Sequence, residues 1–404
     1  MDRVFNLYLA KADQPESGAY AELSLPATPY QIQDAFDKLR LAEGESPYWE
    51  ITEYHQFEDL YDVLDNTCEL YELNALAHRL SDLYGPQRTA FEGLLKMEQE
   101  GENTIPISRL IDLAYSTDCC HVAESVVLDE QLGEFLVEND LVPGLEDMSE
   151  KLYRLLDLEQ IGKEHRQTGG GVFVASGVSA LGGYVELESE VMELYETLDL
   201  TPKAPDYAIL LEVSKGFFND PGYDSEKTVQ LKLPASPEAL SSALEAVEAW
   251  DWRETGWSCL DCRVPALTEL ISDTEEGIDS LNDLAQRLAD MEPNTLIAYK
   301  ALLEATDCKD LQSAETLMDS LDNYIVSPRY SSPSEVAKGK LTVILCESDA
   351  ALLAPHLNLY QYGQALIEAC GGILTDYGLI ERKDSQPVQT MKDGPNQGGM
   401  ELTW

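Results

Sequence analysis

The chain contains an internal duplication, which constrains its fold more than any other feature of its sequence. Four segments return in the same order, 208 residues later in the first three cases and 201 residues later in the last. These pairs are 23–29 with 231–237, 73–80 with 281–288, 91–95 with 299–303, and 156–162 with 357–363. The sequence therefore predicts two related units at residues 1–200 and 203–383, joined at 201–205. A loose tail follows at 384–404.

Each unit begins with strand and helix signals. Thr28 and Ser236 are followed by proline, which is typical of a helix N-cap with proline at the first helical position. The apolar residues that follow recur with helical spacing. Short β-rich runs are expected at 4–9, 21–25 and 49–54, and in the second unit at 207–213 and 229–233. The sequence predicts an α+β protein, an elongated tandem repeat of small α+β and helical modules that forms an acidic rod. In the first unit we expect modules at about 1–55, 56–122 and 123–200.

The second informative feature is charge. The chain carries 75 acidic and 27 basic residues, a formal net charge of -48. Residues 1–200 hold 41 acids and 12 bases, and residues 201–404 hold 34 acids and 15 bases. Because self-repulsion on this scale opposes a compact fold, the charge indicates a function. It argues against nucleic acid and anionic membranes as partners and favours basic partners, cations or solvation.

Several motifs resemble the ArdA antirestriction proteins. They are Tyr-Trp-Glu-Ile-Thr-Glu-Tyr at 48–54, Leu-Asn-Ala-Leu-Ala at 73–77, and Leu-Asp-Leu-Glu-Gln-Ile-Gly at 156–162, before a glycine-rich strand pair. A usual family member is about one repeat long, so the resemblance covers this chain twice. The motif residues are Asp157, Glu159, Gly162, Lys163 and Glu164. The corresponding Gln364 and Ala365 of the second unit lose both charges, so the first unit is favoured for the family activity.

The resemblance implies a cytoplasmic anti-defence protein of a mobile genetic element. Such a protein mimics duplex DNA and occupies the DNA groove of the methyltransferase and specificity part of a type I restriction–modification enzyme. It implies no catalysis and no cofactor. We expect a homodimer or a covalent pseudo-dimer, with a longer mimic and a two-headed inhibitor as alternatives. At one phosphate charge per roughly 1.7 Å, the net charge matches on the order of 80 Å of duplex.

Carboxylates spaced i, i+4 or i, i+7 on helices form rows that can replace phosphates. We expect residues 186–198 to be helical and to carry one such row. The predicted phosphate-mimicking acids are Glu58, Asp59, Asp62, Asp65, Glu69 and Glu72; Glu134 and Glu138; Glu146, Asp147 and Glu150; Glu186, Glu190 and Glu193; and Glu275, Glu276, Asp279 and Asp283.

Other classes of protein are open at this point. An inhibitor of another DNA-binding defence system, such as an anti-CRISPR protein, would have the same acidic rows. An acidic chaperone of basic proteins and a salt-adapted structural protein are further alternatives. Enzyme and metal signatures are not found. Cys259 and Cys262 lack a second ligand pair and are expected as buried thiols on a strand. No signal peptide and no membrane span are expected.

Overall fold

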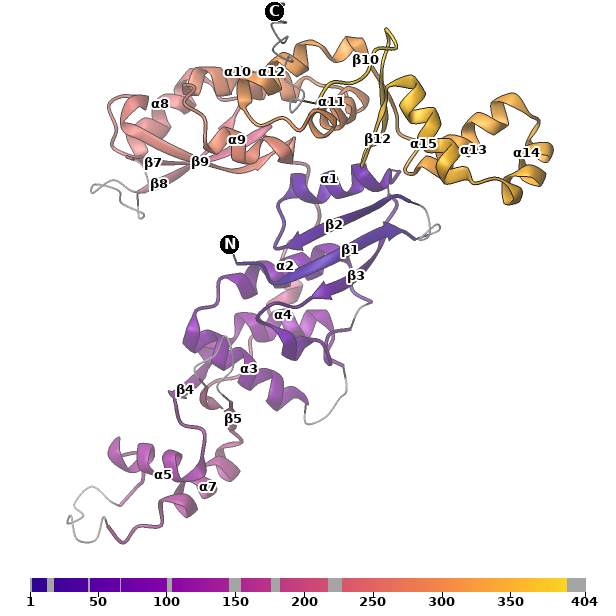
Figure 1. Cartoon of the computed structure of the whole chain (residues 1–404). Coiled ribbons are helices and arrows are strands. Elements are labelled where there is room, and N and C mark those ends of the chain that lie inside the picture. The colour runs from indigo at the N-terminus through magenta and orange to yellow at the C-terminus, as the bar shows by residue number, and fades with distance from the viewer. Residues whose placement is uncertain are drawn as a thin grey trace, which may run out of the picture. The chain divides into compact units, whose positions relative to one another are not determined.

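The structure of this protein is a computed structural model that describes residues 2–12, 18–42, 44–65, 67–99, 104–144, 154–175, 182–216 and 227–390. Within these residues the chain forms 14 α-helices and four small three-stranded sheets (Figure 1). The expected α+β class is therefore confirmed. Among the described helices, none has the length and apolar character that crossing a membrane requires.

The first half of the chain contains these elements in order: β1 (Phe5–Lys11), β2 (Tyr20–Leu25), α1 (Pro29–Leu39), β3 (Pro47–Glu53), the 3₁₀ turn η1 (Glu58–Leu60), α2 (Leu70–Ser81), α3 (Gly85–Gln99), α4 (Ile107–Tyr115), η2 (Thr117–Cys119), β4 (Cys120–Glu124), α5 (Asp129–Glu138), α7 (Leu158–Gly169), β5 (Val172–Val174), β6 (Gly183–Leu187) and η3 (Tyr195–Thr197).

The second half contains β7 (Ile209–Lys215), β8 (Thr228–Leu233), α8 (Pro237–Ala246), η4 (Trp252–Glu254), β9 (Thr255–Cys262), η5 (Pro265–Leu267), α9 (Thr268–Ser272), α10 (Ile278–Ala289), α11 (Pro293–Thr306), α12 (Leu311–Asp319), η6 (Leu321–Asn323), β10 (Tyr324–Ser327), α13 (Pro333–Ile344), α14 (Glu347–Leu353), η7 (Ala354–His356), α15 (Leu359–Cys370), β11 (Ile373–Thr375) and β12 (Gly378–Arg382).

The sheets of the two halves have the same strand order. The first sheet of each half runs β2-β1-β3 and β8-β7-β9, with the strand that comes first in the chain at the centre. The second sheet runs β4-β6-β5 and β10-β12-β11, with the last strand at the centre. Helices α2 and α10 also begin and end 208 residues apart.

The chain divides into two compact units. Unit 1 contains Met1–Tyr8, Ser24–Ala27 and Trp49–Pro202, and unit 2 contains Leu9–Leu23, Thr28–Tyr48 and Lys203–Trp404. Helix α1 thus packs with elements of the second half. Unit 2 has an apolar core that includes Leu211, Leu284 and Tyr299, and a smaller one around Ile380.

The predicted helix starts in the first modules are confirmed. The Thr28 hydroxyl caps α1 in a capping box with Gln31, and the Ser236 hydroxyl accepts from the Ala239 N–H at the start of α8. An asparagine on α2, and another at the same position of α10, hydrogen-bonds to the residue that precedes each N-cap. Asn74 exchanges two hydrogen bonds with the backbone of Ala27, at 2.8 and 3.0 Å.

Asn282 makes the same pair of bonds with Ala235, at 2.7 and 3.3 Å. These bonds supply partners for the backbone groups of Ala27 and Ala235 in two partly buried loops. The requirement explains why an asparagine recurs at this point of both repeated segments.

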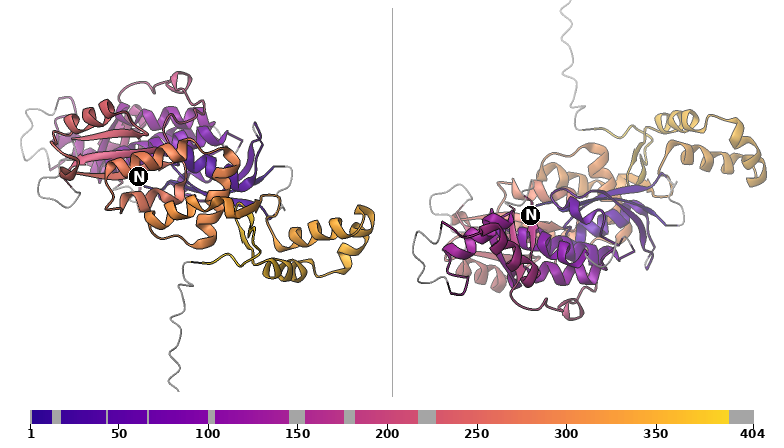
Figure 2. Two further views of the ribbon diagram at one scale, coloured as in Figure 1. Left: turned by 90° about the horizontal axis from the view of Figure 1, so that it is seen from above. Right: turned by 90° about the horizontal axis from the view of Figure 1, so that it is seen from below.

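The recurring motif around Gly162 forms a close helix–helix crossing. Asp157 caps α7, which packs against α5, and Asn358 caps α15, which packs against α13. Figure 2 shows α13 and α15 side by side in the yellow C-terminal part. A Cβ at Gly162 would lie 1.9 Å from the carbonyl oxygen of Asp129. The glycine therefore permits backbone contact between the helices.

Replacing this glycine with alanine should destabilise the helix pair by about 1–3 kcal/mol, because the added methyl forces the backbones apart. The equivalent Gly363→Ala substitution should cost a similar amount, since its Cβ would lie 1.7 Å from the Pro333 carbonyl oxygen. Hydrogen exchange of the α7 and α15 amides would measure the loss. Gly85→Ala on α3 is the control, because nothing lies within 4 Å of its Cβ position. Equal protection in Gly162→Ala and Gly85→Ala would contradict the close crossing.

The helix predicted at 186–198 is wrong. Its first residues form strand β6, which pairs antiparallel with both β4 and β5. The following chain is irregular up to η3, where the N–H groups of Leu194 and Tyr195 donate to the buried Asp112 carboxylate at 2.7 and 2.8 Å. Pairing with two strands outweighs the helical spacing of Leu187, Val191 and Leu194.

The Cys259–Cys262 pair and the glycines that follow α7 and α15 have structural roles. Cys259 and Cys262 lie buried on β9, as predicted for free thiols on a strand. Gly170 and Gly371 end helices α7 and α15 in the left-handed conformation, with φ of 71° and 65°. The glycine-rich segments are therefore helix ends followed by strands.

Candidate partner-binding surface

The densest predicted acidic set lies around η1 and the start of α2. Leu60, Val63 and Leu64 point into the core of unit 1 with at most 5% exposure. The neighbouring acids Glu58, Asp59 and Asp62 are exposed, and Asp65 is partly exposed. The alternation of buried apolar and exposed acidic residues directs this run of carboxylates to solvent.

The last two acids of this set also have local roles. Glu69 caps α2, and Glu72 accepts the Glu69 N–H at 2.8 Å in a capping box. The hydroxyl of Tyr195 donates to Glu72 as well. The Glu72 charge and hydrogen bond, together with burial, raise the pKa of Tyr195 to about 12. Their carboxylates are thus partly engaged in holding α2 and the 194–197 segment.

Two other predicted groups lie on exposed helix faces. Glu134 and Glu138 are exposed on α5, and Glu130 extends them to an i, i+4, i+8 row that the sequence interpretation had not included. Asp279 and Asp283 are exposed on α10. Glu275 lies just before α10 and is also exposed, whereas Glu276 is partly buried and accepts the Ser280 hydroxyl.

The group assigned to residues 186–198 does not form a row. Glu186 lies on β6, where it accepts the Tyr184 hydroxyl at 3.0 Å and contacts His165 Nε2 at 2.8 Å. Glu190 and Glu193 are exposed in the irregular segment after the strand. Their expected helical alignment is therefore a wrong prediction. Glu146, Asp147 and Glu150 lie outside the described residues.

The family-motif residues lie on α7. Asp157 is its N-cap and accepts the Gln160 N–H at 3.0 Å, and Gly162 faces α5. The side chains of Glu159, Lys163 and Glu164 at this end of the helix are exposed. They add charges of both signs to the surface of the helix pair.

Few carboxylates are neutralised by basic neighbours. Where both partners are described, ten Lys and Arg side chains pair with eleven Asp and Glu side chains. None of the predicted surface acids in the described residues pairs with Lys or Arg. Since the whole chain has 75 acids and 27 bases, most carboxylates must face solvent ions or a partner.

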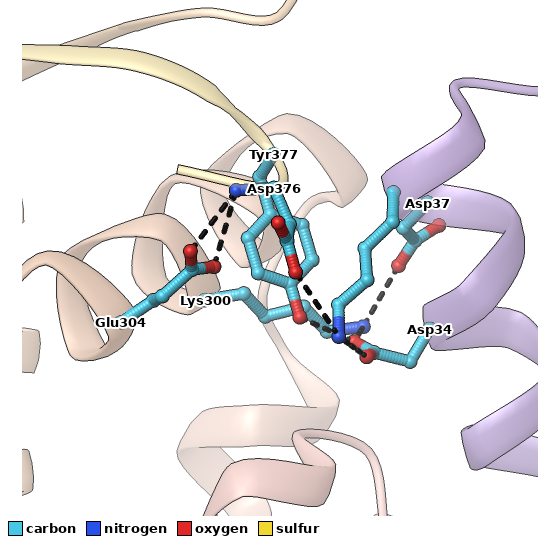
Figure 3. A network of polar contacts seen from close by, with 7 residues as sticks. Asp34, Asp37, Lys300, Glu304, Asp376 and Tyr377 are labelled. Carbon is cyan, nitrogen blue, oxygen red and sulfur yellow. Dashed lines mark hydrogen bonds and ion pairs between the residues drawn. The ribbon is translucent and has the colours of Figure 1, made fainter. Parts of the chain in front are cut away.

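A buried ion network in unit 2 was not foreseen from the sequence. Lys300 on α11 is 2% exposed, and its ammonium lies 2.7 Å from Asp34 Oδ1 and 2.8 Å from Asp37 Oδ2 on α1. The Tyr377 hydroxyl donates to Asp34 at 2.8 Å, and Lys38 contacts both Asp34 and Asp376 (Figure 3). The network joins α1 to α11 and to the turn between β11 and β12.

The charges in this network reinforce one another. Burial alone would raise the pKa of Asp34, but Lys300, Lys38 and the hydrogen bonds from Lys300 and Tyr377 lower it overall. Burial, and then the Asp34 charge and hydrogen bond, raise the pKa of Tyr377 far above its usual range. Asp34 is thus a carboxylate and Tyr377 a neutral donor at neutral pH.

A second buried contact holds the start of α1. The Thr28 hydroxyl donates to Asp261 Oδ1 at 2.6 Å, and the Tyr207 hydroxyl donates to Asp261 Oδ2 at 2.9 Å. Tyr30 donates its hydroxyl to the Tyr207 carbonyl. Both ends of α1 are therefore held by the second-half elements of unit 2.

No protein-family model, curated protein or solved structure matches the chain in comparisons with known proteins. Within the described residues, no group of three His, Cys, Asp or Glu side chains is placed to hold a metal ion. The acidic surface is thus the feature on which a functional argument rests.

Proposed function

We propose that this protein is a DNA mimic that inhibits a DNA-binding enzyme by occupying its DNA-binding groove. The observation that carries the proposal is the set of exposed carboxylates without Lys or Arg partners, on a chain with a net charge of -48. A basic groove already arranged for phosphates would pair with these carboxylates and release their counterions.

The spacing of the exposed acids supports phosphate mimicry. Residues four apart on a helix are about 6 Å apart along its axis, which is close to the rise of two base pairs on one DNA strand. The row Glu130, Glu134 and Glu138 on α5 and the pair Asp279 and Asp283 on α10 have this spacing. Each presents negative charge at intervals that a phosphate-binding groove can accept.

The proposed target is a type I restriction–modification enzyme, because the motifs at 48–54, 73–77 and 156–162 resemble the ArdA family. The matching strand orders and helix positions of the two halves support a tandem of two such units. We propose that the units form an elongated acidic rod. The first repeat, residues 1–200, is the stronger candidate for binding, since its Lys163 and Glu164 keep the charge signs of the family motif.

Inhibition should be competitive with duplex DNA and strongly dependent on salt. If the protein pairs about 6–10 carboxylates with basic groups, its affinity should fall by about 10³–10⁵ between 50 and 200 mM salt. Inhibition constants of a type I enzyme, measured over this salt range and at several DNA concentrations, would test this.

Four results would separate the alternatives. Inhibition that is independent of DNA concentration would refute occupation of the groove. Equal binding to unrelated basic proteins would favour an acidic chaperone, and inhibition of a different DNA-binding defence enzyme alone would change the target. Unfolding at 50 mM salt, followed by circular dichroism, would favour a salt-adapted protein.

A further inference from the structure

After strand β6, the chain of unit 1 crosses the end of helix α4 as a short segment, residues 192–195, which we call the strap. Two side chains of α4 hold its backbone. The Ser116 hydroxyl accepts the first N–H of the strap at 2.9 Å, and Asp112 Oδ1 accepts the last two at 2.7 and 2.8 Å. Ser116 is 0% and Asp112 8% exposed. The strap thus supplies donors to acceptors that are withdrawn from water.

Helix α12 is the counterpart of α4 in unit 2. The two helices, the 3₁₀ turns that follow them and the next strands all begin 204 residues apart. At this offset Asp112 corresponds to Thr316 and Ser116 to Ser320. Thr316 is exposed and Ser320 partly exposed. Within the described part of the chain, no N–H group donates to either hydroxyl, so this end of α12 has the acceptors of a strap without the strap.

The hydroxyls on α12 are free to accept. Ser116 donates its own proton to a carbonyl one turn earlier at 2.7 Å while it accepts from the strap. Ser320 and Thr316 donate in the same way to carbonyls one turn earlier, at 2.9 and 3.0 Å. A hydroxyl that donates once still has its acceptor lone pairs. Both can therefore take a backbone N–H as Ser116 does.

The strap sequence returns near the end of the chain. Met192-Glu193-Leu194 recurs as Met400-Glu401-Leu402, 208 residues later, and the same offset relates α1 to α8 and α2 to α10. The second copy lies outside the described residues. Since β12 begins 195 residues after β6, the connection that leads to it is longer than the one in the first half by the difference of 13 residues. The repeat therefore extends beyond residue 383.

A side-chain pair of the strap changes together between the halves. In unit 1 the Tyr195 hydroxyl donates to Glu72 at the start of α2. At the offset of 208, Tyr195 becomes Thr403 and Glu72 becomes Ser280. The phenol and the carboxylate that it contacts are thus replaced together. This joint replacement is expected if residue 403 occupies the place of Tyr195.

The described chain ends close to α12. Val388 is 6% exposed and belongs to the apolar cluster against which Leu321, the neighbour of Ser320, packs. From residue 390, ten further residues lead to Met400, and ten residues span up to about 33 Å. Helix α12 has nine residues, a length of about 14 Å. The connection is therefore long enough to bring the second copy of the strap to the end of α12.

We propose that the end of α12, at Thr316 and Ser320, is the docking site for residues 400–403 of the same chain. Ser320 accepts the first N–H of this second strap, and Thr316 accepts the last two. The Glu401 side chain faces solvent, as Glu193 does in unit 1. A neutral hydroxyl is a weaker acceptor than a carboxylate. The second strap is therefore held less tightly than the first and opens more readily. The inference does not rest on the proposed function.

Hydrogen exchange of the full-length protein, followed by mass spectrometry, tests the docking site. The amides of residues 402 and 403 should exchange at least about tenfold more slowly than in a free peptide of residues 391–404, because hydrogen bonding protects them. The amides of residues 194 and 195, which donate to Asp112, are the internal reference.

Three variants assign any protection to this site. Thr316→Asp installs the carboxylate of the first half and should slow exchange about a further tenfold. Thr316→Val keeps the shape but removes the acceptor, and should return exchange to nearly the free-peptide rate. Glu401→Ala is the matched control within the strap, and should leave exchange unchanged because the position faces solvent.

Free-peptide exchange rates in both the wild-type protein and Thr316→Asp would overturn the docking site. Protection that Thr316→Val leaves unchanged would overturn it as well, since the segment would then bind elsewhere. Protection that disappears on dilution would show that the segment binds a second copy, and would overturn docking within one chain. Each result is independent of whether the protein inhibits a DNA-binding enzyme.

Discussion

Lys300→Met should lower the free energy of unfolding of unit 2 by about 3–5 kcal/mol, the usual cost of removing one partner from a buried ion pair. The Lys300 side chain is 2% exposed, and the carboxylates of Asp34 and Asp37 beside it are 10% and 14% exposed. Methionine preserves most of the packing volume but leaves these carboxylates without the ammonium. Chemical denaturation followed by tryptophan fluorescence would measure the loss.

Lys309→Met is the matched control. Lys309 also pairs with an aspartate, Asp307, at 2.6 Å, but its side chain is 74% exposed. Its loss should therefore cost at most about 1 kcal/mol. Adding Asp34→Asn and Asp37→Asn to Lys300→Met should recover part of the stability, because the uncompensated charges are then removed. Similar losses for Lys300→Met and Lys309→Met would contradict a buried network.

The pH dependence of the same network has a definite sign. Because the pKa of Asp34 is lower in the folded protein than in the unfolded chain, the carboxylate contributes stability above the unfolded pKa. That contribution is lost as pH falls through the lower, folded value. The stability difference between wild type and Asp34→Asn should therefore be fully present above about pH 5 and shrink below about pH 4.

Local chemistry made the first modules predictable from the sequence. Thr28 and Ser236 with their following prolines fixed two helix starts, and apolar spacing located α2 and α10. These signals act within a few residues, so tertiary packing has little to change. The helix prediction for 186–198 failed because strand β6 forms by pairing with β4 and β5. No local sequence pattern reveals that pairing.

The buried network was missed for a related reason. A lysine on an amphipathic helix is usually solvated, and nothing near Lys300 in the sequence shows that α1 covers it. One signal was present in the duplication, since Phe91-Glu92 in one repeat becomes Tyr299-Lys300 in the other. A reversal of charge inside an aligned core segment indicates different surroundings in the two copies.

The position of α1 also affects how the two repeats can be studied. A fragment of residues 1–200 would separate α1 from Lys300, Tyr377 and Asp261, and would expose Asp34 and Asp37 to solvent. The behaviour of such a fragment would therefore report on the lost contacts as well as on the repeat. Substitutions in the full chain separate the functions of the halves more cleanly.

Neutralising four acids of the first half together, as Glu58→Gln, Asp59→Asn, Asp62→Asn and Asp65→Asn, should weaken inhibition of the target enzyme about a hundredfold. Each exposed charge pair contributes at most about 1 kcal/mol. Four pairs of about 0.7 kcal/mol sum to about 2.8 kcal/mol, and 1.4 kcal/mol is tenfold in affinity. Each substitution alone should therefore weaken inhibition only about threefold, as measured by inhibition constants at fixed salt.

Two further fourfold substitutions serve as the control and the comparison for this result. Neutralising Glu238, Glu245, Asp290 and Glu292 removes equal charge from exposed positions outside the predicted rows, and should change inhibition much less.

Neutralising Glu275, Glu276, Asp279 and Asp283 tests whether the second half binds the same groove. A large loss there would mean that both repeats imitate one duplex, and no loss would confine the mimicry to the first. If a single substitution abolishes inhibition, or if the outlying set costs as much as the first, the binding energy is not distributed over a phosphate-like row.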